Sequence, residues 1–312
     1  MLKLISIGLL SGLFFSTTFI LNRLMSLEGG HWVWSASLRY AFMILFLMGW
    51  MVCTRGPATA IGLLAYFFRH WQFWGIAGGI GFGGFYSLLC FSADFAPGWV
   101  VATTWQFTII ATLIVLRCFG KTFPARTWFF SAIVFAGVVC VNLSQVNAAE
   151  PRQLLLGGVP VLIAAFCYPI GNQLVWEAGK GNRRLPDLRG PFLENPFHKV
   201  LLLSLGSVPF WLVLVVITSP PPPSSGQLVN TALVAFFSGI CATSLFLFAR
   251  SRSRRASELA AVDSTQSSEV IFAMIGEILF LGSALPGGFA MAGVGSVLLG
   301  LALFVFFQEA DG

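Results

Sequence analysis

The sequence contains little charge. Asp, Glu, Lys and Arg make up 10% of its 312 residues, while hydrophobic residues make up 57%; a typical soluble domain has about 25% charged residues. The longest stretch between apolar runs, 179–198, has only the length of a loop, so the chain leaves no room for a separate soluble domain. This composition excludes an ordinary soluble enzyme and indicates a protein embedded in a lipid bilayer.

The sequence also lacks the patterns typical of metal and cofactor sites. Its six cysteines fall within or at the edges of apolar runs, without a CxxC pair or a Cys/His spacing. Its three histidines, His31, His70 and His198, lie at the ends of runs or in loops, so we expect no Ser/His pair at membrane depth. No HEXXH motif is present. We therefore expect no metal, no cofactor and no enzymatic activity.

What the chain does have is a series of apolar runs of about 20 residues, the length that crosses a bilayer. We count about ten. They lie near residues 3–25, 32–53, 71–92, 97–118, 127–147, 155–178, 199–218, 227–249, 256–281 and 286–307. The first run continues past Phe19 without a small-residue cleavage pattern, so we interpret it as a span and not as a secretory signal. The expected fold is an all-α integral membrane protein.

The net charge is +6, but the distribution of the basic residues is explained by membrane topology and does not indicate a nucleic-acid partner. If the amino terminus is cytoplasmic, alternate loops collect most of the Lys and Arg residues, from Lys3 to Arg255. The opposite side keeps only Arg23 and Arg152, and Arg39 falls inside a span. The positive-inside rule then predicts that both termini are cytoplasmic.

The ten predicted spans divide into two sets of five, residues 1–150 and 151–312, which resemble each other weakly. The matching pairs include Asn22 with Asn172 and Gln106 with Gln266. Because five is odd, the second set enters the membrane from the opposite side, as in the inverted repeats of many transporters, whose substrate site lies near mid-membrane between the repeats. A helical bundle with coincidental similarity is the alternative.

Three stretches carry a family resemblance. The third span is "GIAGGIGFGGFYSLLCFSADFAP", it leads into "GWVVATTWQ", and the ninth span closes with "GEILFLG". With two sets of five spans, these stretches resemble the drug/metabolite transporter (DMT, EamA-like) superfamily, particularly its multidrug resistance efflux branch. The resemblance implies an exporter of small molecules in the bacterial cytoplasmic membrane and does not identify the molecule. The glycines of the third span predict close helix contacts.

The chain departs from this family in two places. Members often end the fourth helix of each repeat with Gly-Glu; Gly276-Glu277 keeps this pattern in the second half, but the first half has Arg117 at the equivalent place. The four-helix multidrug relatives carry an essential glutamate in their first helix, where this chain has Thr17 and Thr18. Their proton-coupling mechanism therefore does not transfer by position.

The ninth span carries three acids within an apolar run, 259–280. At 1.5 Å per residue from its basic start, Asp263 would lie about 10 Å deep, Glu269 about 20 Å, and Glu277 about 30 Å, at the far interface. Acids at membrane depth are costly and normally face a bundle interior or a water-filled cavity. Arg39 is the one deep base, and one structural interpretation is that it pairs with one of these two deep acids. The other acid would then be unpaired and could bind protons or substrate. We favour Glu269; the alternative is that both acids are structural.

Polar and aromatic residues of other spans complete the predicted site. The candidates for substrate or proton binding are Glu269, Asp263, Gln266, Arg39, Tyr168, Asn172, Asn22, Trp105 and Gln106. At 100° per residue, Gln266 shares a helix face with Asp263. Tyr168 and the two asparagines could line a polar cavity or merely accompany a proline kink. Trp105 could form an aromatic wall for an organic cation or simply pack.

These observations predict a secondary active exporter of small organic molecules, drug-like cations or metabolites, that works by alternating access, with proton coupling left open. An amino-acid or metabolite exporter of the same fold is one alternative, because Arg39 together with acids would suit a zwitterion. A non-transporting receptor or assembly protein is an alternative from another class; it predicts that Asp263→Asn with Glu269→Gln is tolerated. The expected partners are the lipid bilayer and a small molecule, and two repeats in one chain favour a monomer.

Overall fold

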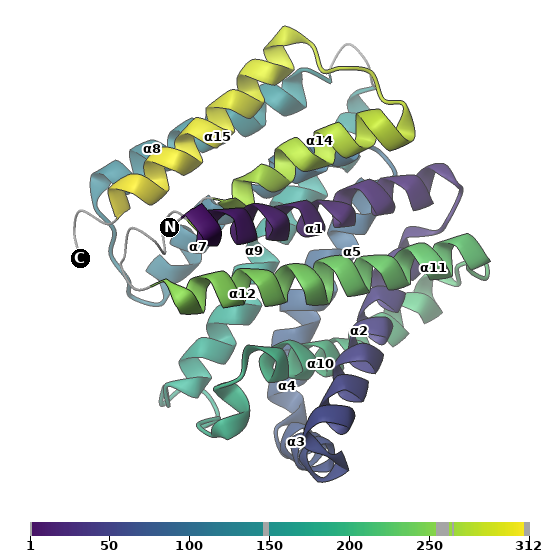
Figure 1. The fold of residues 1–312 in the computed structure, drawn as a ribbon, viewed down its shortest axis with the longest axis vertical. Coiled ribbons are helices and arrows are strands. Elements are labelled where there is room, and N and C mark those ends of the chain that lie inside the picture. The colour runs from purple at the N-terminus through teal and green to yellow at the C-terminus, as the bar shows by residue number, and fades with distance from the viewer. Residues whose placement is uncertain (1, 146–149, 254–261, 264, 309–312) are drawn as a thin grey trace.

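The computed structural model describes residues 2–145, 150–253, 262–263 and 265–308, and every regular element in these ranges is a helix (Figure 1). The elements are α1 (Leu2–Leu27), α2 (Trp32–Arg55), α3 (Pro57–Arg69), α4 (Trp71–Gly78), η1 (Gly79–Gly84), α5 (Phe85–Ser92), α6 (Gly98–Trp105), α7 (Thr108–Cys118), α8 (Ala125–Leu143), α9 (Pro151–Gly179), η2 (Pro191–Leu193), α10 (Pro196–Thr218), α11 (Ser225–Val234), η3 (Ala235–Ala242), α12 (Thr243–Arg252), η4 (Thr265–Ser267), α14 (Ser268–Leu281) and α15 (Gly288–Gln308). Arg254, Arg255 and Ser264 lie outside the described residues.

The predicted all-α membrane fold is confirmed. In the described part of the chain, 9 helical stretches are long and apolar enough to cross a membrane. They match nine of the predicted spans, and α14 occupies the position of the predicted ninth span, whose beginning falls outside the described residues. One helix, α3, lies where the sequence indicated a loop between two spans. It begins directly after Gly56, whose φ of 82° lies in the region that favours glycine.

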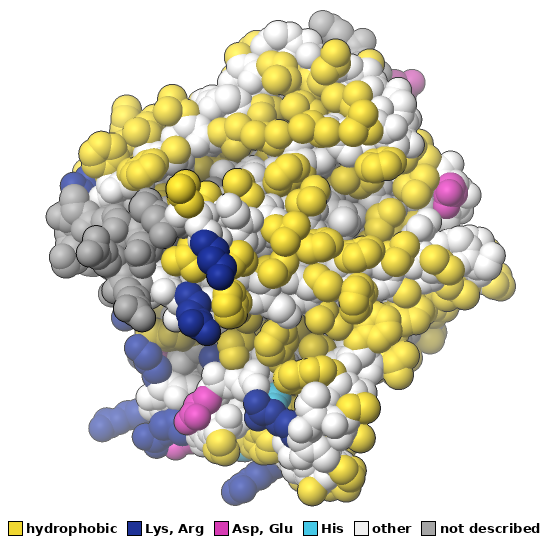
Figure 2. Space-filling model, in the orientation of Figure 1, with side chains coloured by type: hydrophobic (Ala, Val, Ile, Leu, Met, Phe, Trp, Pro, Cys, Tyr) yellow, Lys and Arg dark blue, Asp and Glu magenta, His cyan; other side chains and the backbone are white. Residues whose placement is uncertain are grey.

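The helices run between two ends of the bundle. The amino terminus and the end of the described chain lie close together on one side, and the α1–α2 turn and the start of α11 lie on the other (Figure 1). Hydrophobic side chains cover most of the visible face, and Lys and Arg side chains gather towards the side of the termini (Figure 2). We call this side the basic end. A broad apolar surface with charge confined to its edge is the surface expected of a protein in lipid.

First-half and second-half helices pack reciprocally. Helix α1, the first span, packs against α11, η3, α12 and α14 of the second half, while α9, the sixth span, packs against η1, α5, α6 and α7 of the first half. Helices α8 and α15 form a pair at one side of the bundle (Figure 1). The two helices approach closely at Gly137, because this residue has no side chain there: an added Cβ would be 2.6 Å from the Gly293 carbonyl oxygen.

The glycine-rich third span makes some of the close contacts that the sequence predicted. A Cβ on Gly81 would lie 2.9 Å from the Gly171 Cα, and one on Gly78 would lie 2.7 Å from the Gly206 carbonyl carbon. No neighbour lies within 4 Å of a Cβ on Gly75, so that glycine does not serve helix packing. Where two backbones touch without side chains between them, any larger residue would push the helices apart.

Several spans are interrupted near their middle. The third span contains the π-helical segment η1 and the eighth contains the π-helical segment η3. The fourth span breaks between α6 and α7 at Gln106 and Phe107, and the ninth contains the 3₁₀ turn η4, which includes Gln266. Irregular turns of this kind leave backbone groups less regularly bonded and are frequent at functional sites.

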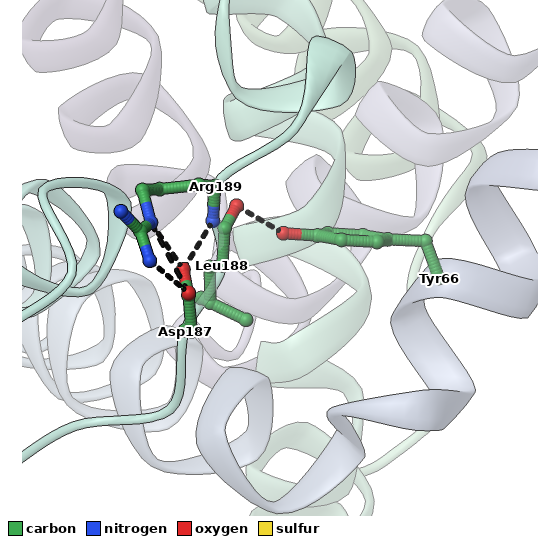
Figure 3. Close-up of polar contacts among 4 residues, drawn as sticks. All are labelled: Tyr66, Asp187, Leu188 and Arg189. Atoms are coloured by element: carbon green, nitrogen blue, oxygen red, sulfur yellow. Dashed lines mark hydrogen bonds and ion pairs between the residues drawn. The ribbon is translucent and has the colours of Figure 1, made fainter.

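A loop at the basic end, 180–195, is held against α3. The Tyr66 hydroxyl donates a hydrogen bond to the Leu188 carbonyl oxygen at 2.8 Å, and the Leu188 side chain is buried (Figure 3). Next to it, Arg189 Nε donates to Asp187 Oδ1 at 2.9 Å. Hydrogen bonds from the Arg189 side chain lower the pKa of Asp187 to about 2, and burial raises the pKa of Tyr66 to about 12. The loop is therefore anchored by Tyr66 and shaped by an exposed ion pair.

Candidate functional site

Arg39 lies about two turns into α2 and is the centre of a polar cluster inside the bundle. Its side chain is only 9% exposed, and the guanidinium lies over the Tyr86 ring at 4.1 Å from the ring centroid. Arg39 Nη2 donates to Ser238 Oγ at 3.2 Å, and Thr18 Oγ1 donates to the same oxygen at 2.6 Å. Asn22 Nδ2 donates to the Tyr86 hydroxyl at 3.0 Å. We call these five residues, which come from α1, α2, α5 and η3, the Arg39 cluster.

The expected partner of Arg39 is missing from this cluster. Among the described residues, the ion pairs are Arg189 with Asp187 and Arg250 with Asp263, and Arg39 Nε has no hydrogen-bond partner. The interpretation that Arg39 pairs with Asp263 or Glu269 is therefore wrong. The residues that contact its guanidinium are neutral, so its positive charge has no countercharge among the described residues.

Asp263 lies near the basic end of the bundle. Its Oδ1 is 3.0 Å from Nε of Arg250 in the last turn of α12, and the two side chains are 35% and 43% exposed. This half-exposed position beside Arg250 does not fit the depth expected for Asp263. The expectation that Gln266 shares a face with Asp263 assumed a regular α-helix through this segment, but Gln266 lies in the 3₁₀ turn η4 (Thr265–Ser267) and is half-buried.

Glu269 and Gln106 come together in the bundle interior. Glu269 lies in the first turn of α14 and is 8% exposed. Gln106 Nε2 donates to Glu269 Oε1 at 2.6 Å and to the Ala102 carbonyl oxygen at 3.3 Å. Gln106 reaches the acid because α6 ends directly before it. Glu269 therefore faces a neutral amide from the first half of the chain.

An aromatic group lies between these two sites. The Trp105 ring is 4.7 Å from Phe85 and 5.8 Å from Tyr168, and Phe85 is 5.2 Å from Tyr168, measured between ring centroids. Tyr168 is 39% exposed although it lies near the middle of α9. In the sequence, Phe85 precedes Tyr86 of the Arg39 cluster, and Trp105 precedes Gln106, which binds Glu269. We call Phe85, Trp105 and Tyr168 the aromatic triad.

The two asparagines belong to different surroundings. Asn22 is buried in the Arg39 cluster, whereas Asn172 Nδ2 donates to the Tyr168 carbonyl oxygen at 2.9 Å, one turn along α9. The structure thus places Asn22 with Arg39, Gln106 with Glu269, and Trp105 and Asn172 with Tyr168. The chain neighbours Phe85 and Tyr86 connect these groups, since their rings are 5.7 Å apart.

Glu277 has a role that the sequence analysis missed. It lies about one turn from the end of α14, close to the predicted interface, but it is only 1% exposed. Its two oxygens accept hydrogen bonds from Gly98 N at 3.0 Å and Trp99 N at 2.9 Å, the first amides of α6. Pro97 precedes α6 and has no side chain that could cap the helix. The absence of a capping residue at this position was the one sign in the sequence that another segment caps α6.

Cavities open near both ends of the bundle, and a further one of about 440 Å³ is lined in part by Arg69, His70 and Leu185. A cavity of about 1150 Å³ lies at the basic end between α2, the start of α10 and η3–α12. Its lining includes Phe46, Trp50, Phe197, Phe236, Ile240 and Phe248, and we call it the apolar chamber. A smaller cavity of about 300 Å³ at the opposite end is lined in part by Arg23, Asp94 and Gln145.

The smaller cavity is polar. Arg23 Nη1 donates to the Ala93 carbonyl oxygen at 2.7 Å. Burial raises the pKa of Asp94, while Ser26, His31 and Arg23 act in the opposite direction. The large cavity at the basic end is thus lined mainly by apolar side chains, whereas the small cavity at the other end also presents Arg23 and Asp94.

Comparisons with known proteins agree with this architecture. Residues 2–310 match the family model described as "EmrE: Putative multidrug resistance efflux transporter". The chain is 37% identical over 328 aligned residues to "Uncharacterized protein YjlA" of Bacillus subtilis (strain 168), covering 99% of this chain and 96% of the relative. It is 34% identical over 292 residues, covering 86% of this chain and 70% of the relative, to "Uncharacterized 42.1 kDa protein in intracellular alkaline protease 3'region" of Shouchella clausii.

A solved structure shares the fold. A chain titled "Crystal structure of protein" matches with a TM-score of 0.60 and 13% identity, over 99% of this chain and 98% of that chain. A helical bundle with many apolar spans and a family match over nearly its whole length defines the protein as a multi-pass membrane transporter. The chain belongs to the EmrE-type multidrug resistance efflux transporter family, within the drug/metabolite transporter superfamily.

Proposed function

We propose that this protein is a secondary active exporter that moves small organic molecules across the bacterial cytoplasmic membrane by alternating access, with protons exchanged at Glu269. The 2.6 Å contact between Glu269 Oε1 and Gln106 Nε2 carries the proposal. It joins the two predicted halves in the bundle interior, and Glu269 has no basic partner among the described residues. Acids in such places mark proton and substrate pathways.

The two halves, 1–150 and 151–312, act as the moving units in this proposal. Their reciprocal packing, in which α1 contacts α12 and α14 while α9 contacts α5 and α7, supports an inverted repeat. The π-helical segments of the third and eighth spans and the breaks of the fourth and ninth support it too. One chain supplies both halves, so a monomer is sufficient for transport.

The basic end faces the cytoplasm in this proposal, because Lys and Arg concentrate in cytoplasmic loops. Both termini then lie inside the cell, and the apolar chamber opens on the side from which an exported molecule is collected. A cysteine introduced at Asn182, in the loop at the basic end, should react with a membrane-impermeant maleimide only after cells are opened, in a background without the native cysteines. Labelling in intact cells would contradict this orientation.

Glu269→Gln tests the transport proposal. Purified protein in proteoliposomes under an imposed pH gradient is given a panel of organic amines, carboxylates and amino acids, and the internal pH is followed. Substrate-dependent proton movement should occur in the wild type and be lost in Glu269→Gln. The matched control is Glu28→Gln, which neutralises an exposed acid at the end opposite the basic end.

Two outcomes would contradict this proposal. Proton movement that persists in Glu269→Gln at the wild-type rate would exclude Glu269 as the coupling residue. The absence of substrate-dependent movement in the wild type with every compound would contradict coupled transport and favour the receptor alternative.

A further inference from the structure

We propose that the transported molecule carries a carboxylate on an apolar body and that Arg39 binds this carboxylate. The inference rests on the transport function proposed above and names the class of its substrate. It departs from the drug-like cations considered in the sequence analysis, and it comes from the contacts of Arg39 in the bundle.

Within the described part of the chain, no acid neutralises the charge of Arg39. The side chain is 9% exposed, its hydrogen-bond partners Ser238 and Tyr86 are both neutral, and its Nε has no partner among the described residues. The face of the Tyr86 ring at 4.1 Å gives partial compensation. A buried charge without a partner is costly, and a guanidinium cannot relieve that cost by losing its proton. A negatively charged ligand would neutralise it.

The geometry favours a carboxylate over a phosphate. A guanidinium presents a planar set of donors that matches a carboxylate with two parallel hydrogen bonds, and Nε of Arg39 is a donor still available for such a pair. The neighbours of the guanidinium in the cluster, Thr18, Ser238 and Tyr86, are neutral. One positive charge balances one negative charge, as on a carboxylate, and would leave a phosphate dianion half-compensated.

One stripe of α2 connects the lining of the apolar chamber with Arg39. Arg39, Met43, Phe46 and Trp50 follow one stripe of α2 at helical spacing, and Phe46 and Trp50 line the chamber. Phe46 lies about 10 Å along the helix axis from Arg39. The chamber wall formed by Phe46, Phe236 and Ile240 suits an apolar or aromatic body, so the approach and the binding group together fit a hydrophobic carboxylate.

Met43 separates the chamber from the Arg39 cluster. A Cβ added to Gly239 would lie 3.0 Å from Met43 Sδ, so the two residues are in contact, and Gly239 follows Ser238, which accepts from Arg39. A methionine side chain is flexible and adapts to neighbours of different shapes. It can therefore turn aside for a ligand without movement of the helices.

The experiment compares three probes that share one phenylpropyl body: 3-phenylpropionate, its primary amide, and 3-phenylpropylamine. Binding is measured by the shift of the thermal unfolding temperature of the purified protein in detergent, followed by tryptophan fluorescence. Only 3-phenylpropionate should stabilise the wild type. Its affinity should fall at least tenfold in Arg39→Gln and less in Arg39→Lys, which keeps the charge and loses the planar donors. The control Arg152→Gln removes one exposed positive charge and should bind like the wild type.

A second measurement keeps the test independent of how the variants fold. Phenylglyoxal, which modifies arginine, is applied to the wild-type protein, and the modified residues are identified by mass spectrometry. 3-Phenylpropionate should protect Arg39 from modification while its amide does not. Equal binding of 3-phenylpropionate to the wild type and to Arg39→Gln would overturn the inference. So would stabilisation of the wild type by the amine or the amide but not by the carboxylate, or stronger binding of phenyl phosphate than of 3-phenylpropionate.

The inference and the transport proposal fail in different ways. If 3-phenylpropionate binds in an Arg39-dependent manner but no probe crosses the proteoliposome membrane, the inference stands and transport does not. If 3-phenylpropylamine drives proton movement that Glu269→Gln abolishes and Arg39→Gln leaves intact, transport stands and the inference is overturned.

Discussion

Replacing Glu277 should release the start of α6 from α14. Its carboxylate accepts from Gly98 N at 3.0 Å and from Trp99 N at 2.9 Å, and these first amides of a helix have no acceptor within the helix itself. The acid also lies at the positive end of the α6 dipole. Glu277 of α14 therefore caps the amino-terminal end of α6.

The expected magnitude follows from these two bonds. A hydrogen bond to a charged group contributes about 1.5–3 kcal/mol, so Glu277→Ala, which removes both acceptors, should lower the free energy of unfolding by about 3–6 kcal/mol. Glu277→Gln keeps one acceptor oxygen but places an NH₂ group against the other amide, so it should lose about half as much. Glu28→Ala, at an exposed acid, should stay within about 0.5 kcal/mol of the wild type.

Two assays check this prediction. Equilibrium unfolding in mixed detergent micelles gives the free energies, and hydrogen exchange with mass spectrometry reports on the amides of Gly98 and Trp99. Those amides should exchange faster in Glu277→Ala than in the wild type, while α15 should be unaffected. The reasoning is refuted if Glu277→Ala unfolds within 0.5 kcal/mol of the wild type and leaves the exchange of the α6 amides unchanged.

Further predictions concern helix contacts, the basic-end loop and pH. Gly171→Ala should destabilise the bundle by about 1–3 kcal/mol, because its Cβ would lie 2.7 Å from the Ala77 carbonyl oxygen; a melting temperature equal to that of the wild type would contradict this. Tyr66→Phe loses the bond to the Leu188 carbonyl and should cost about 0.5–1.5 kcal/mol, with faster proteolysis of 180–195 as the readout. Burial raises the pKa of Asp94, so ionisation of its carboxyl group opposes folding. The free energy of unfolding of the wild type, relative to that of Asp94→Asn, should therefore fall as the pH rises from about 4 through the raised pKa. Above that pKa the difference should stay constant. If the melting temperatures of the wild type and Asp94→Asn change in parallel with pH, the prediction for Asp94 is wrong.

The sequence predicted the spans well because a bilayer imposes one length and one composition on every crossing helix. It also selected Glu269 and Gln106 as candidate site residues, since a deep acid and a mid-span amide are unusual in apolar surroundings. The structure places the two side chains in hydrogen-bond contact, and their role in transport stays a prediction. The partners of the charged residues could not be derived. Assigning Asp263 to Arg250 required the distance between the eighth and ninth spans. Nothing in the run of hydroxyl and amide side chains predicts the 3₁₀ turn η4.

The Arg39 cluster shows a second limit of the sequence. Counting deep charges along the chain suggested that Arg39 would take one of the acids, but a pairing depends on distances between spans that periodicity does not give. Tyr86 and Ser238 are ordinary residues in their own segments and become important only because α2 brings Arg39 beside them. The role of Glu277 was hidden for the same reason, because its partners are backbone amides about 180 positions away along the chain.

The π-helical segments have a consequence for how the chain can change length. Deleting one residue from an α-helical span rotates everything beyond it by about 100° and shifts it by about 1.5 Å, which would turn packed faces towards lipid. A π-helical segment holds one residue more than the α-helix that it interrupts. Removing one residue from Gly79–Gly84 or from Ala235–Ala242 would return the span to α-helix with its flanking faces in place, so these are the two points within the described spans where a single-residue deletion fits the fold.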